Sequence, residues 1–157
     1  SDIMNRANLQ IKKDITKAPG MFVALLYAEL NMQEKTIGLC SAGQTQPIHL
    51  SAKTGEAVLI ETEGDAFPLG IVEFAEYEET KIALESGDFV IFYTDGVVEA
   101  MNKTEDMYGF DRFISVITEN KGLEAEAFLE KLIEDVNSFV GKAEAHDDLT
   151  IVVIEVD

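Results

Sequence analysis

The chain has 157 residues and carries 12 Lys and Arg against 30 Asp and Glu, which gives a formal net charge of −18 at pH 7. A chain of this length fits one domain, and such domains bury roughly 70% of the surface that the unfolded chain exposes. The negative charge repels nucleic-acid phosphates and anionic lipids, so we expect no nucleic-acid and no membrane partner. No apolar run reaches the roughly 20 residues that cross a bilayer, and the N-terminus lacks a signal pattern, which indicates a cytoplasmic protein.

Cys40 is the single cysteine of the chain. One cysteine excludes an intramolecular disulfide and a zinc site built on thiolates. Cys40 lies in an apolar stretch without a neighbouring His or basic residue that would acidify its thiol. We therefore interpret it as a buried structural thiol.

The first half of the chain predicts one helix followed by hairpin-linked strands. Apolar residues in 2–17 fall on one helical stripe, and Pro19 and Gly20 end that helix. The stretch 21–30 is apolar on both alternating faces, which predicts a strand buried between layers, and a turn leads from it into a partner strand at 35–41. Further strands are expected at 47–50, 57–61 and 74–84.

The second half predicts a central strand, two amphipathic helices and a closing strand. The run 89–93 is wholly apolar, which is typical of a strand with neighbours on both sides. The two helices that follow have apolar faces that include Phe113 and Phe128, and a glycine stands after each. The β-branched segment 149–156 predicts the last strand. Together these elements indicate an α+β fold, a layered antiparallel β-sandwich flanked by helices.

Two carboxylates stand where apolar strands end or begin. Asp95 follows the run 89–93 and precedes Gly96, which lets backbone approach a ligand closely, and Asp147 precedes the last strand. If these strands are antiparallel neighbours, Asp95 and Asp147 meet at one edge of the sheet. Hard oxygen ligands suit magnesium or manganese, which make a water nucleophilic for phosphoryl hydrolysis. On the spacing alone, a simple Asp-Gly turn and a solvated Asp pair remain alternatives.

Five motifs along the chain occur together in one order. They are SAG at 41–43 with Pro47, FPLGI at 67–71, FVIFYTDGVVEA at 89–100, MYGFDR at 107–112 and HDDLT at 146–150. This pattern resembles the bacterial PPM-type phosphatases of the SpoIIE and RsbU kind over essentially the whole chain. The resemblance implies an α/β/β/α architecture and hydrolysis of phosphoserine or phosphothreonine that depends on two manganese or magnesium ions.

The resemblance also implies roles for individual residues. Asp95 and Asp147 would be metal ligands, Gly96 would give backbone access to the metal site, and Asp148 would help to organise it. No side chain is given a catalytic role beyond holding the metal-bound water. Glu99 is interpreted either as the first residue of a helix or as support for the region of Asp95. The loop 67–71 would have a structural or switching role.

Neither histidine is interpreted as catalytic. His146 stands beside Asp147, and we favour a structural or supporting role for it over a role as general acid. His49 has no acidic residue near it in the sequence, so we expect it to be structural or exposed.

The resemblance begins after two strands and a helical segment with which such domains start, and which carry Gly-Asp and Gly-His-Gly motifs. We therefore interpret residues 1–157 as the C-terminal portion of a phosphatase domain, with little activity alone. Its substrate would be a phosphorylated regulatory protein, such as an anti-sigma-factor antagonist in bacterial signalling. An upstream sensory or receiver domain would control the phosphatase. A homodimer is a possible oligomeric state. The alternatives are a non-catalytic binding or dimerisation module without a complete metal site, and a purely structural domain.

Overall fold

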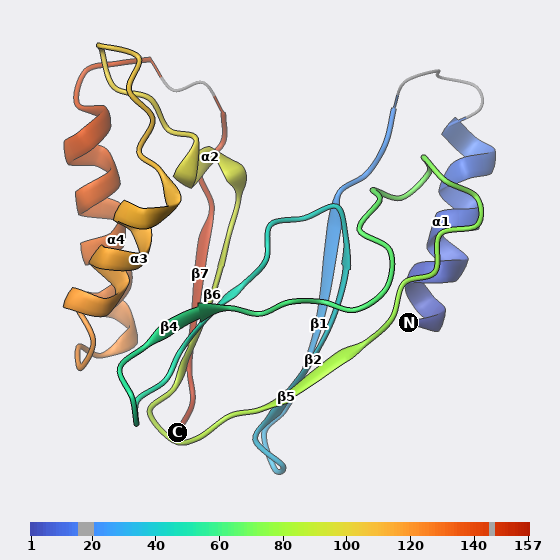
Figure 1. Cartoon of the computed structure of the whole chain (residues 1–157), viewed down its shortest axis with the longest axis horizontal. Helices are drawn as coiled ribbons and strands as arrows, with labels where there is room; N and C mark the ends of the chain where they lie inside the picture. The colour runs from blue at the N-terminus through green and yellow to red at the C-terminus, as the bar shows by residue number, and fades with distance from the viewer. Residues whose placement is uncertain (16–20, 145–146) are drawn as a thin grey trace. The chain divides into compact units, whose positions relative to one another are not determined.

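The computed structural model describes residues 1–15, 21–144 and 147–157. The chain forms two compact units: unit 1 contains 1–46 and 61–84, and unit 2 contains 47–60 and 85–157. Each unit contains one antiparallel sheet and at least one helix (Figure 1). The α+β class and the antiparallel pairing predicted from the sequence are confirmed.

The sheet of unit 1 is built on the predicted hairpin. Strands β1 (Leu25–Asn31) and β2 (Thr36–Ala42) pair antiparallel, and β5 (Thr80–Ala83) pairs with the other side of β2. The Asn31 Oδ1 atom accepts hydrogen bonds from the backbone N–H groups of Gln33, at 3.1 Å, and Glu34, at 3.0 Å. This side-chain turn explains why the chain reverses where it does.

Helix α1 (Asp2–Ile15) is fastened to the loop that contains the 67–71 motif. The buried Asn8 side chain donates to the Val72 carbonyl at 2.9 Å and accepts from the Gly70 N–H at 2.8 Å. The Tyr77 hydroxyl donates to the Phe67 carbonyl at 2.8 Å. Leu69 and Gly70 of this loop are therefore buried in unit 1, while Phe67 and Ile71 remain exposed. The buried apolar core of the unit consists of Met4, Cys40, Ala42, Leu69, Ala75 and Tyr77.

Two predictions for unit 1 are wrong in part. Strand β1 is not buried between layers: it is the edge strand of its sheet, and Leu25 and Tyr27 are 40% and 38% exposed. The core of the unit forms between α1, β2 and the loop instead. Strand β5 is shorter than the predicted 74–84 strand, because the Tyr77 N–H donates to the Asn5 side chain at 3.0 Å rather than to a neighbouring strand.

Cys40 lies within this core and is 1% exposed. Burial raises the pKa of its thiol above the ordinary value, so the thiolate is disfavoured. The prediction of a buried structural thiol is confirmed.

Unit 2 contains the four-stranded sheet that places the candidate site. Its order is β4 (Ala57–Leu59), β3 (Ile48–Leu50), β6 (Phe89–Tyr93) and β7 (Ile151–Glu155), and every neighbouring pair is antiparallel. Strand β6 lies between two neighbours, as its apolar sequence predicted, and Val90 and Ile91 are fully buried.

Helices α3 (Phe110–Glu119) and α4 (Ala125–Val140) lie side by side against one face of this sheet (Figure 1). Their buried rings meet the rings of the central strand: the centroids of Phe128 and Phe89 are 5.0 Å apart, and those of Phe113 and Tyr93 are 5.1 Å apart. Such aromatic pairs add about 0.5 to 1.5 kcal/mol each beyond the burial of their area. No helix in the described ranges is long and apolar enough to cross a membrane.

Arg112 joins the two helices. Its Nε and Nη2 atoms donate to the two carboxylate oxygens of Asp135 at 2.8 and 2.9 Å, and Tyr108 donates to the same carboxylate at 2.8 Å. The guanidinium carbon also lies 5.2 Å from the ring centroid of Tyr108 and 5.1 Å from that of Phe139. The hydrogen bonds from Arg112 hold the pKa of Asp135 below its ordinary value. The MYGFDR motif therefore has a packing role in unit 2.

Asp88 fastens the turn that leads into β6. Its side chain is 3% exposed and accepts three hydrogen bonds, from Ala52 N–H at 2.9 Å, Glu85 N–H at 2.9 Å and His49 Nε2 at 2.8 Å. Burial by itself raises the pKa of Asp88, but the three donors outweigh burial and hold the pKa below its ordinary value. His49 is thus structural, and its acidic partner lies 39 residues away in the sequence.

Candidate metal site

Asp95 lies where β6 ends and the short helix α2 (Asp95–Val98) begins. Thr94 is the N-cap residue of this helix, with an extended backbone at φ −92° and ψ 159°. The Asp95 side chain is exposed, and its Oδ1 atom accepts from the Gly96 N–H at 3.0 Å. Helix α2 was not predicted. Glu99, interpreted as a possible helix start, is instead the C-cap residue, and its N–H donates to the Asp95 carbonyl at 2.8 Å.

Thr94 joins the end of β6 to the segment before β7. Its N–H donates to the Thr150 carbonyl at 3.1 Å, and its hydroxyl accepts from the Thr150 N–H at 3.1 Å and donates to the Asp148 carbonyl at 3.0 Å. These bonds continue the β6–β7 pairing beyond the register pair Tyr93 and Ile151. The predicted antiparallel adjacency is confirmed. Thr94 was not among the residues predicted for the site, although a hydroxyl residue at the end of a strand, directly before Asp-Gly, is a signal for such a role.

Gly96 brings the two Asp motifs into contact. A Cβ atom built on Gly96 would lie 2.5 Å from the Asp148 carbonyl oxygen and 3.5 Å from the Asp147 Cβ. Only a residue without a side chain allows the backbone at 147–148 to pass so closely. The sequence predicted that Gly96 opens its backbone to a metal; the structure shows that its open face is turned to Asp148. The contact places Asp147 beside the residue that follows Asp95, at one edge of the sheet.

The backbone of Asp148 forms hydrogen bonds with both sides of the candidate site. Its N–H donates to the Asp147 Oδ1 atom at 2.7 Å, while its carbonyl accepts from Thr94. Asp147 and Asp148 are both exposed. His146 lies outside the described residues. The structure therefore brings together Asp95, Gly96, Asp147 and Asp148, the four residues predicted for the site.

The donors at this edge suit a magnesium or manganese ion. In Asp95 and in Asp147, the Oδ1 atom accepts from the N–H of the following residue, which orients the carboxylate. Magnesium is usually held by one or two carboxylates, with waters and substrate phosphate in its remaining positions. Within the described residues, no group of three or more His, Cys, Asp and Glu side chains is placed to hold an ion. Asp95, Asp147 and Asp148 do not form such a group together, so an ion at this edge would take most of its ligands from water or from other groups.

A pocket of about 280 Å³ adjoins Asp147, and we call it the flank pocket. It lies between the end of α4, the segment after α2 and the segment before β7. The apolar walls of the pocket come from Ala100, Met101, Val136, Val140 and Leu149. The remaining lining residues are Gly96, Glu99, Asn137, Glu144 and Asp147.

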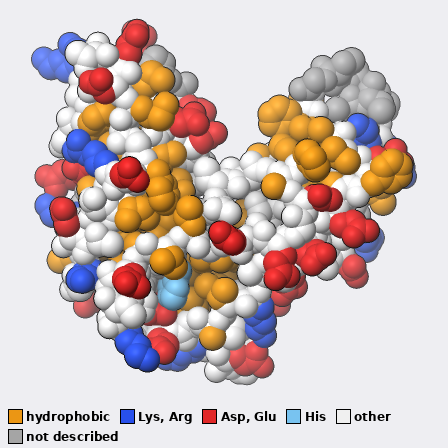
Figure 2. All heavy atoms as spheres, viewed as in Figure 1, with side chains coloured by type: hydrophobic (Ala, Val, Ile, Leu, Met, Phe, Trp, Pro, Cys, Tyr) orange, Lys and Arg blue, Asp and Glu red, His pale blue; other side chains and the backbone are white. Residues whose placement is uncertain are grey.

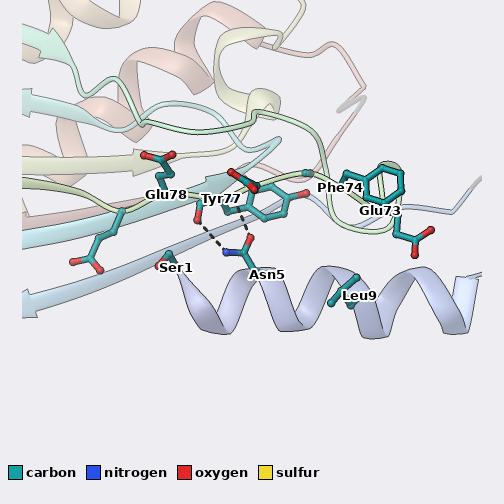
Figure 3. A pocket seen from close by; sticks show the side chains of 10 residues that line it. Ser1, Asn5, Leu9, Glu73, Phe74, Tyr77 and Glu78 are labelled. Carbon is teal, nitrogen blue, oxygen red and sulfur yellow. Dashed lines mark hydrogen bonds between the residues drawn. The ribbon is translucent and has the colours of Figure 1, made fainter.

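A larger cleft, of about 600 Å³, lies in unit 1 between α1 and residues 73–79 (Figure 3). Asn5 extends from α1 to the Tyr77 backbone, accepting from its N–H at 3.0 Å and donating to its carbonyl at 3.5 Å. The ionisable side chains that line this cleft are mainly glutamates, and none of the residues predicted for the metal site lies there. Size alone does not identify a catalytic site, so we place the candidate site at the sheet edge in unit 2.

Comparison with known proteins decides the family. The family described as Stage II sporulation protein E (SpoIIE) matches residues 1–157. The chain belongs to the SpoIIE family. Over 154 residues it is 25% identical to the phosphoserine phosphatase RsbU of Bacillus subtilis (strain 168), a match that covers 98% of this chain and 44% of that relative. The chain thus spans less than half the length of RsbU.

Solved structures share the fold of this SpoIIE-family chain. The SiaA-PP2C domain of Pseudomonas aeruginosa superposes with a TM-score of 0.70 at 16% identity, over 99% of this chain and 68% of that one. The manganese-presoaked phosphatase domain of SpoIIE from Bacillus subtilis has a TM-score of 0.61 at 18% identity, over 92% of this chain and 59% of that one. The resemblance and the fold class predicted from the sequence are confirmed.

Proposed function

We propose that residues 1–157 are the C-terminal portion of a metal-dependent phosphatase domain that hydrolyses phosphoserine or phosphothreonine in a regulatory protein. One observation carries the proposal: Asp95 and Asp147 stand at one sheet edge, where Gly96 and Asp148 hold their backbones together. Membership of the SpoIIE family and the similarity to a phosphoserine phosphatase support it. A signalling protein such as an anti-sigma-factor antagonist is the proposed substrate, in the cytoplasm, under an upstream sensory or receiver domain.

In this proposal Asp95 and Asp147 are ligands of manganese or magnesium, with two ions in the complete domain. When bound, such ions polarise a phosphoryl oxygen and lower the pKa of a water to near neutrality. The chain itself orients the two carboxylates through the N–H groups of Gly96 and Asp148. With a net charge of −18, the protein needs bound cations to attract a phosphate dianion to this edge. No nucleophilic side chain of the chain is required.

The test uses the full-length protein, stripped of metal by a chelator and then titrated with manganese. Calorimetry should detect manganese binding that Asp95→Asn weakens, and an aryl phosphate and a phosphoserine protein should be hydrolysed only when manganese is present. Turnover that persists without metal, or that Asp95→Asn leaves unchanged, would exclude the proposed site. Manganese binding without any turnover would favour a non-catalytic binding module.

A further inference from the structure

We propose that the flank pocket binds a lysine or arginine side chain of the substrate, a few residues from the phosphorylated position. The inference rests on the proposed phosphatase function and concerns how the same site selects its substrate. Glu99 and Glu144 would be the residues that recognise the cation, with α4 as the apolar wall.

The size and walls of the pocket fit one long side chain. Sites for small-molecule ligands usually enclose about 300 to 1,000 Å³, and this pocket, at about 280 Å³, falls below that range. Val136 is fully buried beneath the pocket, and Val140 and Met101 are half-buried at its wall. Lysine and arginine bury an aliphatic stem along such a surface and keep the charged group at the polar rim.

The charge of Glu99 and Glu144 at the rim of the flank pocket determines which kind of side chain binds there. Glu99 and Glu144 are exposed, and neither forms a salt bridge with another residue in the described ranges. Their negative charge disfavours a phosphate or an acidic side chain and favours a cation. Asn137 adds an amide from α4. A substrate segment that presents a base beside its phosphoserine would therefore match the two neighbouring sites.

The pocket is continuous with the candidate metal site, because Asp147 and Gly96 belong to both. Cations bound at Asp95 and Asp147 would hold the phosphate and so would fix the phosphorylated residue at this edge. The substrate residues on either side of it would then pass the mouth of the pocket. An extended peptide advances roughly 3.3 Å per residue. The base is thus expected within about three residues of the phosphorylated one, given this spacing and the length of a lysine side chain.

The test measures kcat/KM of the full-length manganese-loaded protein on phosphoserine peptides. Each peptide carries lysine at one position from three before to three after the phosphoserine, and its control carries norleucine there, which keeps the stem without the charge. We expect lysine at one position to raise kcat/KM about two- to fivefold, in line with the strength of exposed ion pairs. In the double variant Glu99→Gln with Glu144→Gln, the ratio of lysine to norleucine should fall towards one.

The matched control is Glu130→Gln, which removes one exposed charge from α4 outside the pocket. It should keep the wild-type ratio. A lysine preference that is absent, or that the double variant retains, overturns this inference while the phosphatase function stands. Failure to hydrolyse both the peptides and an aryl phosphate overturns the proposed function, and this inference with it.

Discussion

The carbonyl of Asp148 occupies the space that a side chain would need at Gly96, since a Cβ there would lie 2.5 Å from that oxygen. The obstacle is backbone and cannot rotate away. The same backbone donates to Asp147 and accepts from Thr94, so a shift at this point moves the proposed metal ligand.

Gly96→Ala should therefore weaken manganese binding and phosphatase activity in the full-length protein by about 10- to 100-fold, as expected when the support of a ligand is disturbed. It should also destabilise the protein by about 1 to 3 kcal/mol through overpacking. Gly38→Ala is the control, because its Cβ would lie 2.6 Å from Glu79 Oε1, the end of an exposed and flexible side chain. Calorimetric manganese affinity equal to wild type in Gly96→Ala would contradict the assignment.

Asp147→Asn should abolish activity in the full-length protein without unfolding it. The amide keeps the shape of the side chain but removes the charge that a hard cation needs. Stability without metal should stay the same or rise, because two nearby carboxylates repel each other. Asp111→Asn, at an exposed position on α3, controls for the loss of one charge. Activity within a few-fold of wild type at saturating manganese would rule out Asp147 as a ligand.

Arg112→Lys should lower the melting temperature of the protein. Lysine cannot reproduce the two parallel hydrogen bonds to Asp135 or the planar contact with the Tyr108 and Phe139 rings. The Arg112 and Asp135 side chains are 43% and 27% exposed, so screening by solvent limits the cost to about 1 kcal/mol. Lys131→Gln, which breaks the exposed pair with Glu134, should cost less. Calorimetric melting curves compare the two, and an equal shift would argue against a special role for Arg112.

Asp88→Asn should destabilise the protein most near neutral pH. The pKa of Asp88 is held below its ordinary value of 3.8, so folding favours the carboxylate. Its contribution is complete above about pH 5 and is lost as the pH falls through the folded-state pKa. The difference in stability between wild type and Asp88→Asn should thus narrow in acid. Denaturant unfolding between neutral and acid pH measures this difference, and a gap that is independent of pH would show that the charge of Asp88 is not what stabilises the turn.

The sequence predicted those helices and strands whose pattern of apolar residues is determined by burial. The apolar run at β6 and the β-branched run at β7 identify strands in the middle and at the end of a sheet, and their antiparallel pairing follows from the fold. The approach of residues 95–96 to residues 147–148 at one edge is a consequence of that pairing. The same pattern failed at β1, because an apolar strand at a sheet edge has the composition of a buried one.

Side-chain partnerships between distant residues could not be predicted. Asp88 and His49 are 39 residues apart, and Arg112 and Asp135 are 23 residues apart, so only packing brings them together. Helix α2 is too short for a periodic pattern to reveal it. The flank pocket exists only where the end of α4 meets two other segments, and no local signal marks it.

The β6–β7 ladder also has a consequence for biosynthesis. Thr150 follows Thr94 by 56 residues, and at a synthesis rate of about 5 to 20 residues per second the ribosome needs roughly 3 to 11 seconds to cover that distance. During this interval β6 is a wholly apolar strand with one bare edge, which is a template for incorrect pairing. A nascent chain stalled before β7 would therefore be a target for chaperones, and the two aspartates would come together only once translation had passed them both.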